Sequence, residues 1–210
     1  GWTRAGCRVT YVFCTDGNAG SHEPGMTRER LAEIRRAEQR AACAVLGVAD
    51  VEFLGKDDGQ LLPTLELRRE LVRLIRKHKP EVVLTSDPMR LFSDRGYINH
   101  PDHRAAGLAA LDAVAPAAEM PLLWPEVGAP HKVHQVYIYG NDQSDTWVDV
   151  TDTIEVKIQA LKKHASQMGD WDPTERIKGW AAQVGQEKGL AYAEKFRVIT
   201  LVQPVEESDD

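Results

Sequence analysis

The chain has 210 residues, which corresponds to one domain at the usual size of about 100–200 residues and suffices to bury a core without disulfides. Its 26 Lys and Arg against 32 Asp and Glu give a net charge of −6, and no basic run is long enough to follow a phosphate backbone, so nucleic acid is not an expected partner. No apolar run approaches the ~18 residues of a membrane helix, and three cysteines without CxxC spacing favour a reducing, cytoplasmic location.

Strand-like and helix-like segments alternate along the chain. β-branched and aromatic residues predict a strand over 8–15 that runs into a Gly-containing polar loop. Helical spacing follows over 27–46, with Thr27 as the N-cap and Gly47 as the residue that ends the helix. The further elements are predicted as a strand at 51–54, a helix at 64–78, a strand at 81–85, a helix at 101–114, strands at 133–139 and 147–150, helices at 152–168 and 173–188, and a strand at 196–202.

This alternation predicts an α/β fold, with a Rossmann-like, mostly parallel sheet and helices on both faces in three layers. We expect one domain over residues 1–210. In such sheets ligands bind outside the carboxyl ends of the strands. Polar loops follow three predicted strands, at 16–25, 55–60 and 86–103, so we expect the functional site at these loops.

Residues 99–104, Asn-His-Pro-Asp-His-Arg, carry the strongest chemical signal. His100 and His103 are three residues apart at a helix start, which places both rings on roughly one side of the helix. A neutral imidazole is a common zinc ligand, and the second ring could act as a general acid or stabilise an oxyanion. Asp102 could orient a ring. The alternative is a capped helix start with two solvated histidines.

Four other segments are weaker candidates. The glycines of the loop at 15–20 could cradle a nucleotide or a sugar beside Asp16, although the loop is neither GxGxxG nor a P-loop. Charged residues at 35–38 are typical of a solvated helix face, and Asp57-Asp58-Gly59 is typical of a turn, whose carboxylates could equally hold hydroxyl groups. The histidine of the segment 164–167, His-Ala-Ser-Gln, suits the dipole of a late helical turn.

Together these segments resemble one family. The chain contains Arg35 and Glu38 in an Arg-x-x-Glu pattern, Leu-Gly-Val at 46–48, Phe-Leu-Gly at 53–55 with Asp-Gly at 58–59, and His-Pro-Asp-His-Arg-Ala-Ala-Gly at 100–107. In this order they resemble the LmbE-like/PIG-L family of zinc-dependent de-N-acetylases, over about residues 7–114 and more loosely to 164–167. The resemblance implies a hydrolase that removes the N-acetyl group from an N-acetylglucosamine-type amino sugar or conjugate.

The resemblance also implies roles for individual residues. His103 matches a zinc ligand, His100 matches the histidine that stabilises the oxyanion or protonates the leaving amine, and Asp102 matches its carboxylate neighbour. Tyr97 lies near the family's oxyanion-side tyrosine. Arg35 and Asp58 match positions that hold the sugar or its aglycone, and we add Asp16 as a substrate-binding residue. Iron, cobalt or nickel are alternatives to zinc.

One family motif is absent from these 210 residues. Family members carry Ala-His-Pro-Asp-Asp-x-Glu, which supplies two zinc ligands and the general base, just upstream of a stretch like 2–12. We therefore expect the given sequence to be N-terminally incomplete and to hold part of the site. A non-catalytic α/β module that binds a sugar or nucleotide, and a truncated, inactive deacetylase, are the alternatives. The expected partners are an N-acetylated amino sugar and, as a homo-oligomer, further copies of the chain.

Overall fold

A computed structural model of the chain describes residues 1–93 and 96–203, which form two compact units. The first unit comprises Gly1–Leu61 and Trp147–Lys195, and the second begins with Leu62–Thr146 and resumes at Phe196. Each unit is therefore built from two separate stretches of the chain. The expectation of one domain stays a prediction. No helix among the described residues is long and apolar enough to span a membrane.

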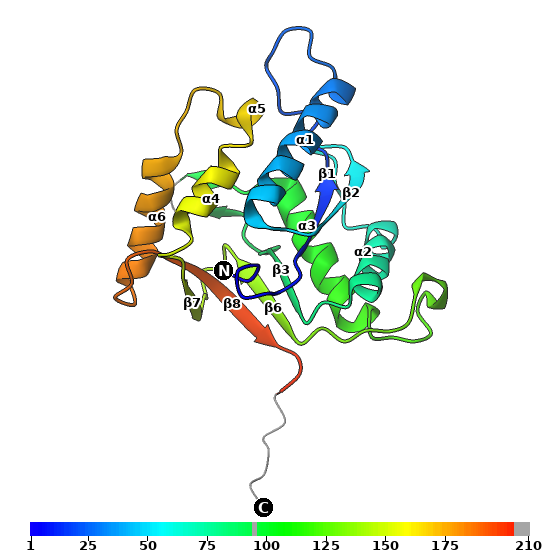
Figure 1. Cartoon of the computed structure of the whole chain (residues 1–210). Coiled ribbons are helices and arrows are strands. Elements are labelled where there is room, and N and C mark those ends of the chain that lie inside the picture. Colours follow the sequence, from blue (N-terminus) through cyan, green and yellow to red (C-terminus); the bar gives the residue numbers. More distant parts are fainter. Residues whose placement is uncertain (94–95, 204–210) are drawn as a thin grey trace, which may run out of the picture. The chain divides into compact units, whose positions relative to one another are not determined.

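In the first unit, two parallel strands are joined by a long helix. Strand β1 (Thr10–Thr15) pairs with β2 (Asp50–Lys56), and helix α1 (Arg28–Leu46) connects them, as Figure 1 shows. Thr27 caps α1 by accepting the N–H of Arg30, and Gly47 ends it at φ 71°, a left-handed conformation that glycine adopts without steric cost. The strand, helix and both capping residues agree with the sequence prediction.

The second stretch of the first unit contains further helices. Its helices are α4 (Ile154–Leu161), α5 (Ala165–Met168) and α6 (Thr174–Gln186). Apolar side chains of α4 and α6 form a core cluster with Val150, which precedes α4; the other members are Ile154, Ile158 and Ala181. The single helix predicted at 152–168 is wrong, because the chain leaves helical geometry between α4 and α5. His164 consequently precedes α5 and does not occupy a late helical turn.

The second unit contains helices α2 (Leu65–His78) and α3 (Pro101–Asp112), which contact each other. Helix α3 also lies next to strand β3 (Val82–Ser86), as Figure 1 shows. Strand β3 pairs in parallel with β6 (Gln135–Tyr139), whereas β8 (Ala193–Thr200) runs antiparallel to β6. The order of these three strands is β3-β6-β8. Strand β7 (Thr146–Asp149) begins at the last residue of the first stretch of the second unit and continues in the first unit. The α/β fold is confirmed, but this sheet is mixed.

Two short strands were not predicted from the sequence. β4 (Phe92–Ser93) and β5 (Tyr97–Ile98) form an antiparallel pair inside the segment expected to be a polar loop. Two residues per strand are too few for the period-2 pattern to be detected. After α3 the chain continues through a π-helical turn (Ala113–Ala117) and a 3-10 turn (Pro125–Val127) before it reaches β6.

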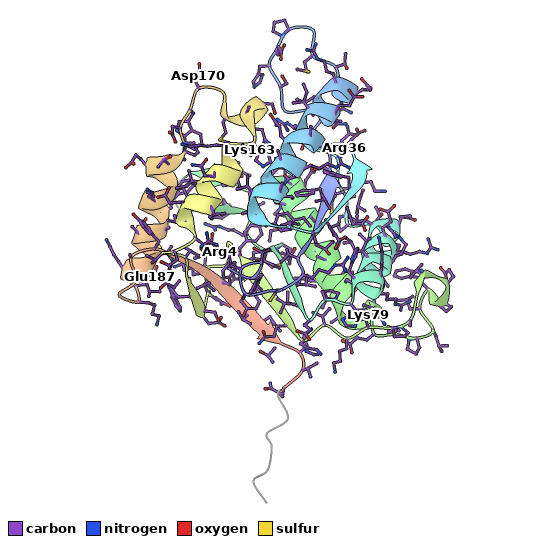
Figure 2. All side chains as sticks on the ribbon, viewed as in Figure 1. Arg4, Arg36, Lys79, Lys163, Asp170 and Glu187 are labelled. Atoms are coloured by element: carbon purple, nitrogen blue, oxygen red, sulfur yellow. The ribbon has the colours of Figure 1, made fainter. Side chains whose placement is uncertain are left out.

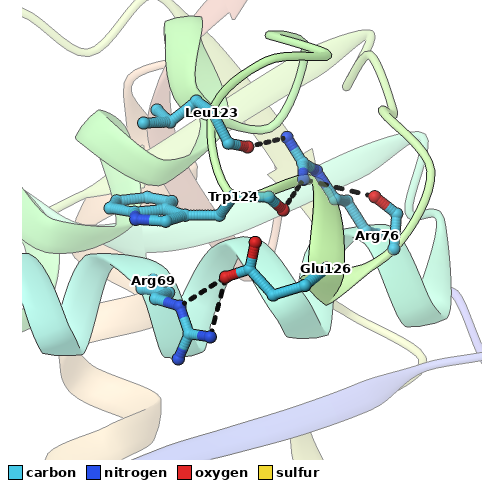
Figure 3. A network of polar contacts seen from close by, with 6 residues as sticks. Arg69, Arg76, Leu123, Trp124 and Glu126 are labelled. Carbon is cyan, nitrogen blue, oxygen red and sulfur yellow. Dashed lines mark hydrogen bonds and ion pairs between the residues drawn. The ribbon is translucent and has the colours of Figure 1, made fainter.

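The segment after α3 is organised by one buried cation. The side chain of Arg76 on α2 is only 3% exposed, and its guanidinium donates to six backbone carbonyls, among them those of Leu123 and Trp124 in Figure 3. The acceptors are Ala117, Ala118, Met120, Leu123, Trp124 and Gly128, at 2.7–3.2 Å. Two turns earlier on α2, Arg69 holds the carboxylate of Glu126 at 2.8 Å. The planar fork of arginine thereby replaces regular secondary structure as the partner of these carbonyls.

We expect Arg76→Met to destabilise the protein by at least about 3 kcal/mol, because hydrogen bonds to a charged group contribute about 1.5–3 kcal/mol each and several carbonyls lose their donor together. Urea unfolding measures this difference. Arg73→Met, at an exposed position of the same helix, is the matched control and should change stability by less than about 0.5 kcal/mol. Equal unfolding midpoints for the two variants would contradict the structural role of Arg76.

Candidate active site

The two histidines of the 99–104 segment lie together at the start of α3. His100 is the N-cap residue, and its Nδ1 accepts the backbone N–H of Asp102 at 3.3 Å. Pro101 occupies the first turn, where a missing N–H costs nothing. Because Nδ1 serves as an acceptor, the neutral ring carries its proton on Nε2. The helix start thus fixes the tautomer in which Nε2 is a hydrogen-bond donor.

His103 lies beside His100, with ring centroids 5.4 Å apart and ring planes inclined by 43°. This is the arrangement that the spacing predicts. Between them Asp102 is buried, and its carboxylate lies 3.9 Å from Nδ1 of His100.

The position of α3 is set by its contact with the end of β3. The hydroxyl of Ser86 donates to the carbonyl of His103 at 2.6 Å. One turn further along α3, Gly107 lies so close to β3 that a Cβ atom there would be 2.4 Å from the carbonyl oxygen of Ser86. Only glycine allows this approach, and the approach determines where the histidine rings lie.

The loop before α3 is fixed at both ends. The buried carboxylate of Asp87 accepts the N–H of Met89 and the side-chain amide of Asn141, each at 2.8 Å. At the other end the Asn99 N–H donates to Leu91 at 2.8 Å, and its side chain donates to Arg90 at 3.0 Å. Tyr97 lies in β5 and is 55% exposed.

In the first unit, two arginines of α1 hold the loop that follows β1. Arg36 makes a two-pronged ion pair with the buried carboxylate of Asp16, which is 8% exposed, with Nε–Oδ1 at 2.8 Å. The hydrogen bond to Asp16 raises the pKa of Arg36. Figure 2 labels Arg36 on α1 near β1 and β2. The sequence prediction had treated this position as solvated, because a charged helix face gives no sign of a partner on a neighbouring loop.

Arg35 donates to the carbonyl oxygens of Gly17 and Gly20, the latter at 2.8 Å. The same loop contacts the loop after β2, since Asn18 donates to Asp57 at 2.8 Å and accepts the N–H of Asp58 at 3.0 Å. This is the arrangement expected at the carboxyl ends of neighbouring parallel strands. Within the described residues of the first unit, the Asp58 carboxylate makes no hydrogen bond or ion pair.

A second polar cluster joins α1 to α5. Glu38 accepts the N–H of Ser166 at 2.6 Å and its hydroxyl at 2.7 Å. Nearby, Nδ1 of His164 and Nε of Arg35 are buried and have no hydrogen-bond partner in the described part of the chain. Burial lowers the pKa of His164, and the neighbouring Arg35 lowers it further, against an opposing effect of Glu38. The Arg-x-x-Glu pattern therefore holds a loop with one side chain and a helix with the other.

The predicted site residues thus fall into one group per unit. The second unit brings together His100, Asp102 and His103, with Tyr97 on the preceding strand. The first unit places Asp16 in an ion pair, Arg35 on backbone carbonyls and Asp58 in the adjoining loop. Sequence reasoning missed Ser86 and Arg36, for which no motif exists, whereas Gly107 belongs to the 100–107 string and its role could have been inferred from that position.

The residues at the α3 start fit a divalent metal. His103 offers an imidazole at the protein surface, and the buried Asp102 carboxylate lies directly beside it in the chain. Nitrogen and carboxylate ligands suit zinc and the neighbouring transition metals. His100 and Asp102 also offer ligand atoms within 4.8 Å of each other.

We expect Gly107→Ala to push α3 away from β3 and to cost about 1–3 kcal/mol by overpacking, with loss of the activity that depends on the histidine positions. Thermal unfolding and an activity assay measure the two effects. Gly179→Ala on α6 is the control, because its Cβ would meet nothing within 4 Å. That variant should be stabilised by up to about 1 kcal/mol. Wild-type stability and activity in Gly107→Ala would show that α3 is not held this tightly.

The half-buried His164 predicts a pH dependence of stability. Its folded-state pKa lies below the ordinary value of 6.5, so the unfolded chain binds a proton more readily. This contribution to stability is complete above about pH 6.5 and is lost as the pH falls through the window below it. Chemical unfolding between pH 7.5 and about pH 5 should show a smaller decline for His164→Gln than for wild type. His22→Gln, at an exposed position of the same unit, should keep the wild-type slope.

Comparison with known proteins places these features in a family. Residues 1–114 match the PIG-L family, described as GlcNAc-PI de-N-acetylase. Diacetylchitobiose deacetylase of Thermococcus kodakarensis is 32% identical over 205 residues, which cover 94% of this chain and 74% of the relative. 1D-myo-inositol 2-acetamido-2-deoxy-alpha-D-glucopyranoside deacetylase of Actinosynnema mirum is 30% identical, with 79% of this chain and 72% of the relative covered.

A solved structure agrees with these relatives. N,N'-diacetylchitobiose deacetylase of Pyrococcus horikoshii, in complex with an inhibitor, superimposes with a TM-score of 0.85 at 30% identity, over 94% of this chain and 75% of that chain. The predicted α/β fold and deacetylase function are confirmed by this agreement. The chain belongs to the PIG-L family of GlcNAc de-N-acetylases.

Proposed function

We propose that this chain hydrolyses the acetamide of an N-acetylglucosamine-type sugar or conjugate, releasing acetate and the free amine, with zinc as the metal. The observation that carries the proposal is the pair of adjacent imidazoles at the α3 start, one of them with Nδ1 engaged by the helix. The names of the relatives share the N-acetylated glucosamine unit and differ in what is attached to it.

An acetamide resists hydrolysis because its carbonyl is a poor electrophile and water is a poor nucleophile. When bound, zinc polarises the carbonyl and lowers the pKa of water from 15.7 towards about 7. We assign His103 as a metal ligand, since its ring lies at the surface beside the other site residues. Asp102, the residue before His103 in the chain, offers a carboxylate at the same site.

His100 is suited to act on the carbonyl oxygen and the leaving nitrogen. Its Nε2–H can donate to the oxygen that becomes negative as water adds to the carbon. Loss of one such donor costs about 2.7–4 kcal/mol of transition-state stabilisation in comparable acyl-transfer sites. We also assign His100 as the group that protonates the departing amine, with the buried Asp102 carboxylate 3.9 Å from its Nδ1. Tyr97 is the second candidate donor to the oxyanion.

We assign substrate binding to the first unit. The Asp58 carboxylate can accept sugar hydroxyl groups, and we propose Asp16 as a second substrate-binding residue. Arg35 supports the same loop through Gly17 and Gly20. Three free cysteines agree with a cytoplasmic location, and we expect a homo-oligomer.

We expect His103→Ala of the full-length protein to lose its metal, because a ligand is removed. His100→Ala should keep the metal and lose turnover by about 100-fold or more, as when an oxyanion donor is deleted. Metal content is measured by mass spectrometry, and turnover by release of free amine from an N-acetylglucosamine conjugate. Equal metal content in wild type and His103→Ala would refute the assignment.

Substitution of the first-unit residues should separate binding from chemistry. Asp58→Asn and Arg35→Ala should raise KM or lower kcat/KM and leave the bound metal unchanged, because neither residue breaks or forms bonds. Asp142→Asn, on an exposed loop of the second unit, is the control. If Asp58→Asn has wild-type kinetics with every substrate tested, Asp58 does not bind the sugar.

A further inference from the structure

An open pocket of about 240 Å³ lies where α5 turns towards α6 in the first unit. Its lining includes Met168, Trp171 and Pro173 as apolar members and Lys162, Asp170 and Asp172 as charged members. The volume is below the range of about 300–1,000 Å³ for drug-sized ligands, so the pocket suits one small ring. None of these residues belongs to the candidate active site.

Trp171, the aromatic residue of the pocket, is contacted by an arginine that does not line the pocket. The guanidinium of Arg176 lies 5.7 Å from the ring centre of Trp171 and 4.6 Å from that of Trp180. Both indoles remain 45% exposed. Arg176 and Trp180 do not line the pocket, so their contacts support Trp171 and leave it able to contact a ligand.

The charged wall contains one carboxylate that is fixed and one that is available. Asp172 accepts the hydroxyl of Thr174, pairs with Lys162 at 2.9 Å and accepts the N–H of Thr174 at 2.9 Å, and these contacts lower its pKa to about 2. By contrast, no residue within 1–93 or 96–203 pairs with the carboxylate of Asp170. Figure 2 shows Asp170 at the tip of the segment between α5 and α6.

Hydrogen bonds connect both α5, beside the pocket, and the loop that follows β1 to the same helix, α1. Ser166 of α5 is bound to Glu38 of α1, and one turn away on α1 Arg35 holds the carbonyls of Gly17 and Gly20. The pocket wall and the proposed substrate loop are therefore anchored on the same helix. This explains why a segment with few buried side chains has a defined position.

We propose that this pocket is a saccharide-binding site that takes one pyranose ring of an amino-sugar glycan. A pyranose has an apolar C–H face, which packs on an indole, and a rim of hydroxyl groups, which pair with carboxylates and ammonium groups. Trp171 supplies the apolar face, and Asp170 and Lys162 supply an acceptor and a donor. The choice of an amino sugar rests on the proposed function, whereas the fit to a sugar ring does not.

The test follows the indole N–H signals of the five tryptophans by NMR in EDTA-treated protein, so that no probe is hydrolysed. The signal of Trp171 is identified with Trp171→Phe. Titration with N-acetylglucosamine and its β1,4-linked trimer should shift this signal saturably. Trp171→Ala and Asp170→Asn should weaken the binding reported by neighbouring signals at least about fivefold, and the matched control Trp180→Phe should not.

The outcomes separate this proposal from the proposed function. A Trp171 signal that stays in place while the metal-loaded protein deacetylates N-acetylglucosamine conjugates overturns the saccharide site alone. A saturable shift in a protein without deacetylase activity supports the site and contradicts the function. A changed oligomeric state of Trp171→Ala in light scattering identifies this surface as an interface between copies and overturns the proposal.

Discussion

The candidate active site of the second unit depends on how closely α3 approaches β3. The hydroxyl of Ser86 on β3 donates to the carbonyl of His103 in the first turn of α3. One turn later, Gly107 has no side chain that would keep α3 and β3 apart. The two imidazoles project from this turn. Because the carbonyl of His103 is the atom held, any shift of the helix moves the proposed metal ligand and the proposed acid together.

Three arginines perform a similar structural task in both units. Arg35 and Arg76 donate to backbone carbonyls of irregular segments, and Arg36 donates to a buried carboxylate at a strand end. Irregular loops near a functional site carry backbone groups that no helix or sheet satisfies. A guanidinium with five donors satisfies several of them at once, so these loops hold a defined shape without secondary structure of their own.

Sequence reasoning predicted the regular elements well and the tertiary contacts poorly. The caps at Thr27 and Gly47 are local, so the residue types suffice to find the ends of α1. The i, i+3 histidine pair is also local, and its geometry was predicted. By contrast, the partners of Arg36 and Arg76 lie on segments that only the fold brings near, and the break between α4 and α5 is not marked by proline or glycine.

The central claim is that two neighbouring histidines have different roles, His103 binding the metal and His100 donating a proton from Nε2. Anomalous diffraction at the zinc edge, on zinc-loaded crystals of the full-length protein with an amide inhibitor, tests this claim most directly. We expect the anomalous peak at coordination distance from the His103 ring, with Nε2 of His100 hydrogen-bonded to the inhibitor oxygen. A peak bound to the His100 ring, or one with His103 outside coordination distance, would contradict it.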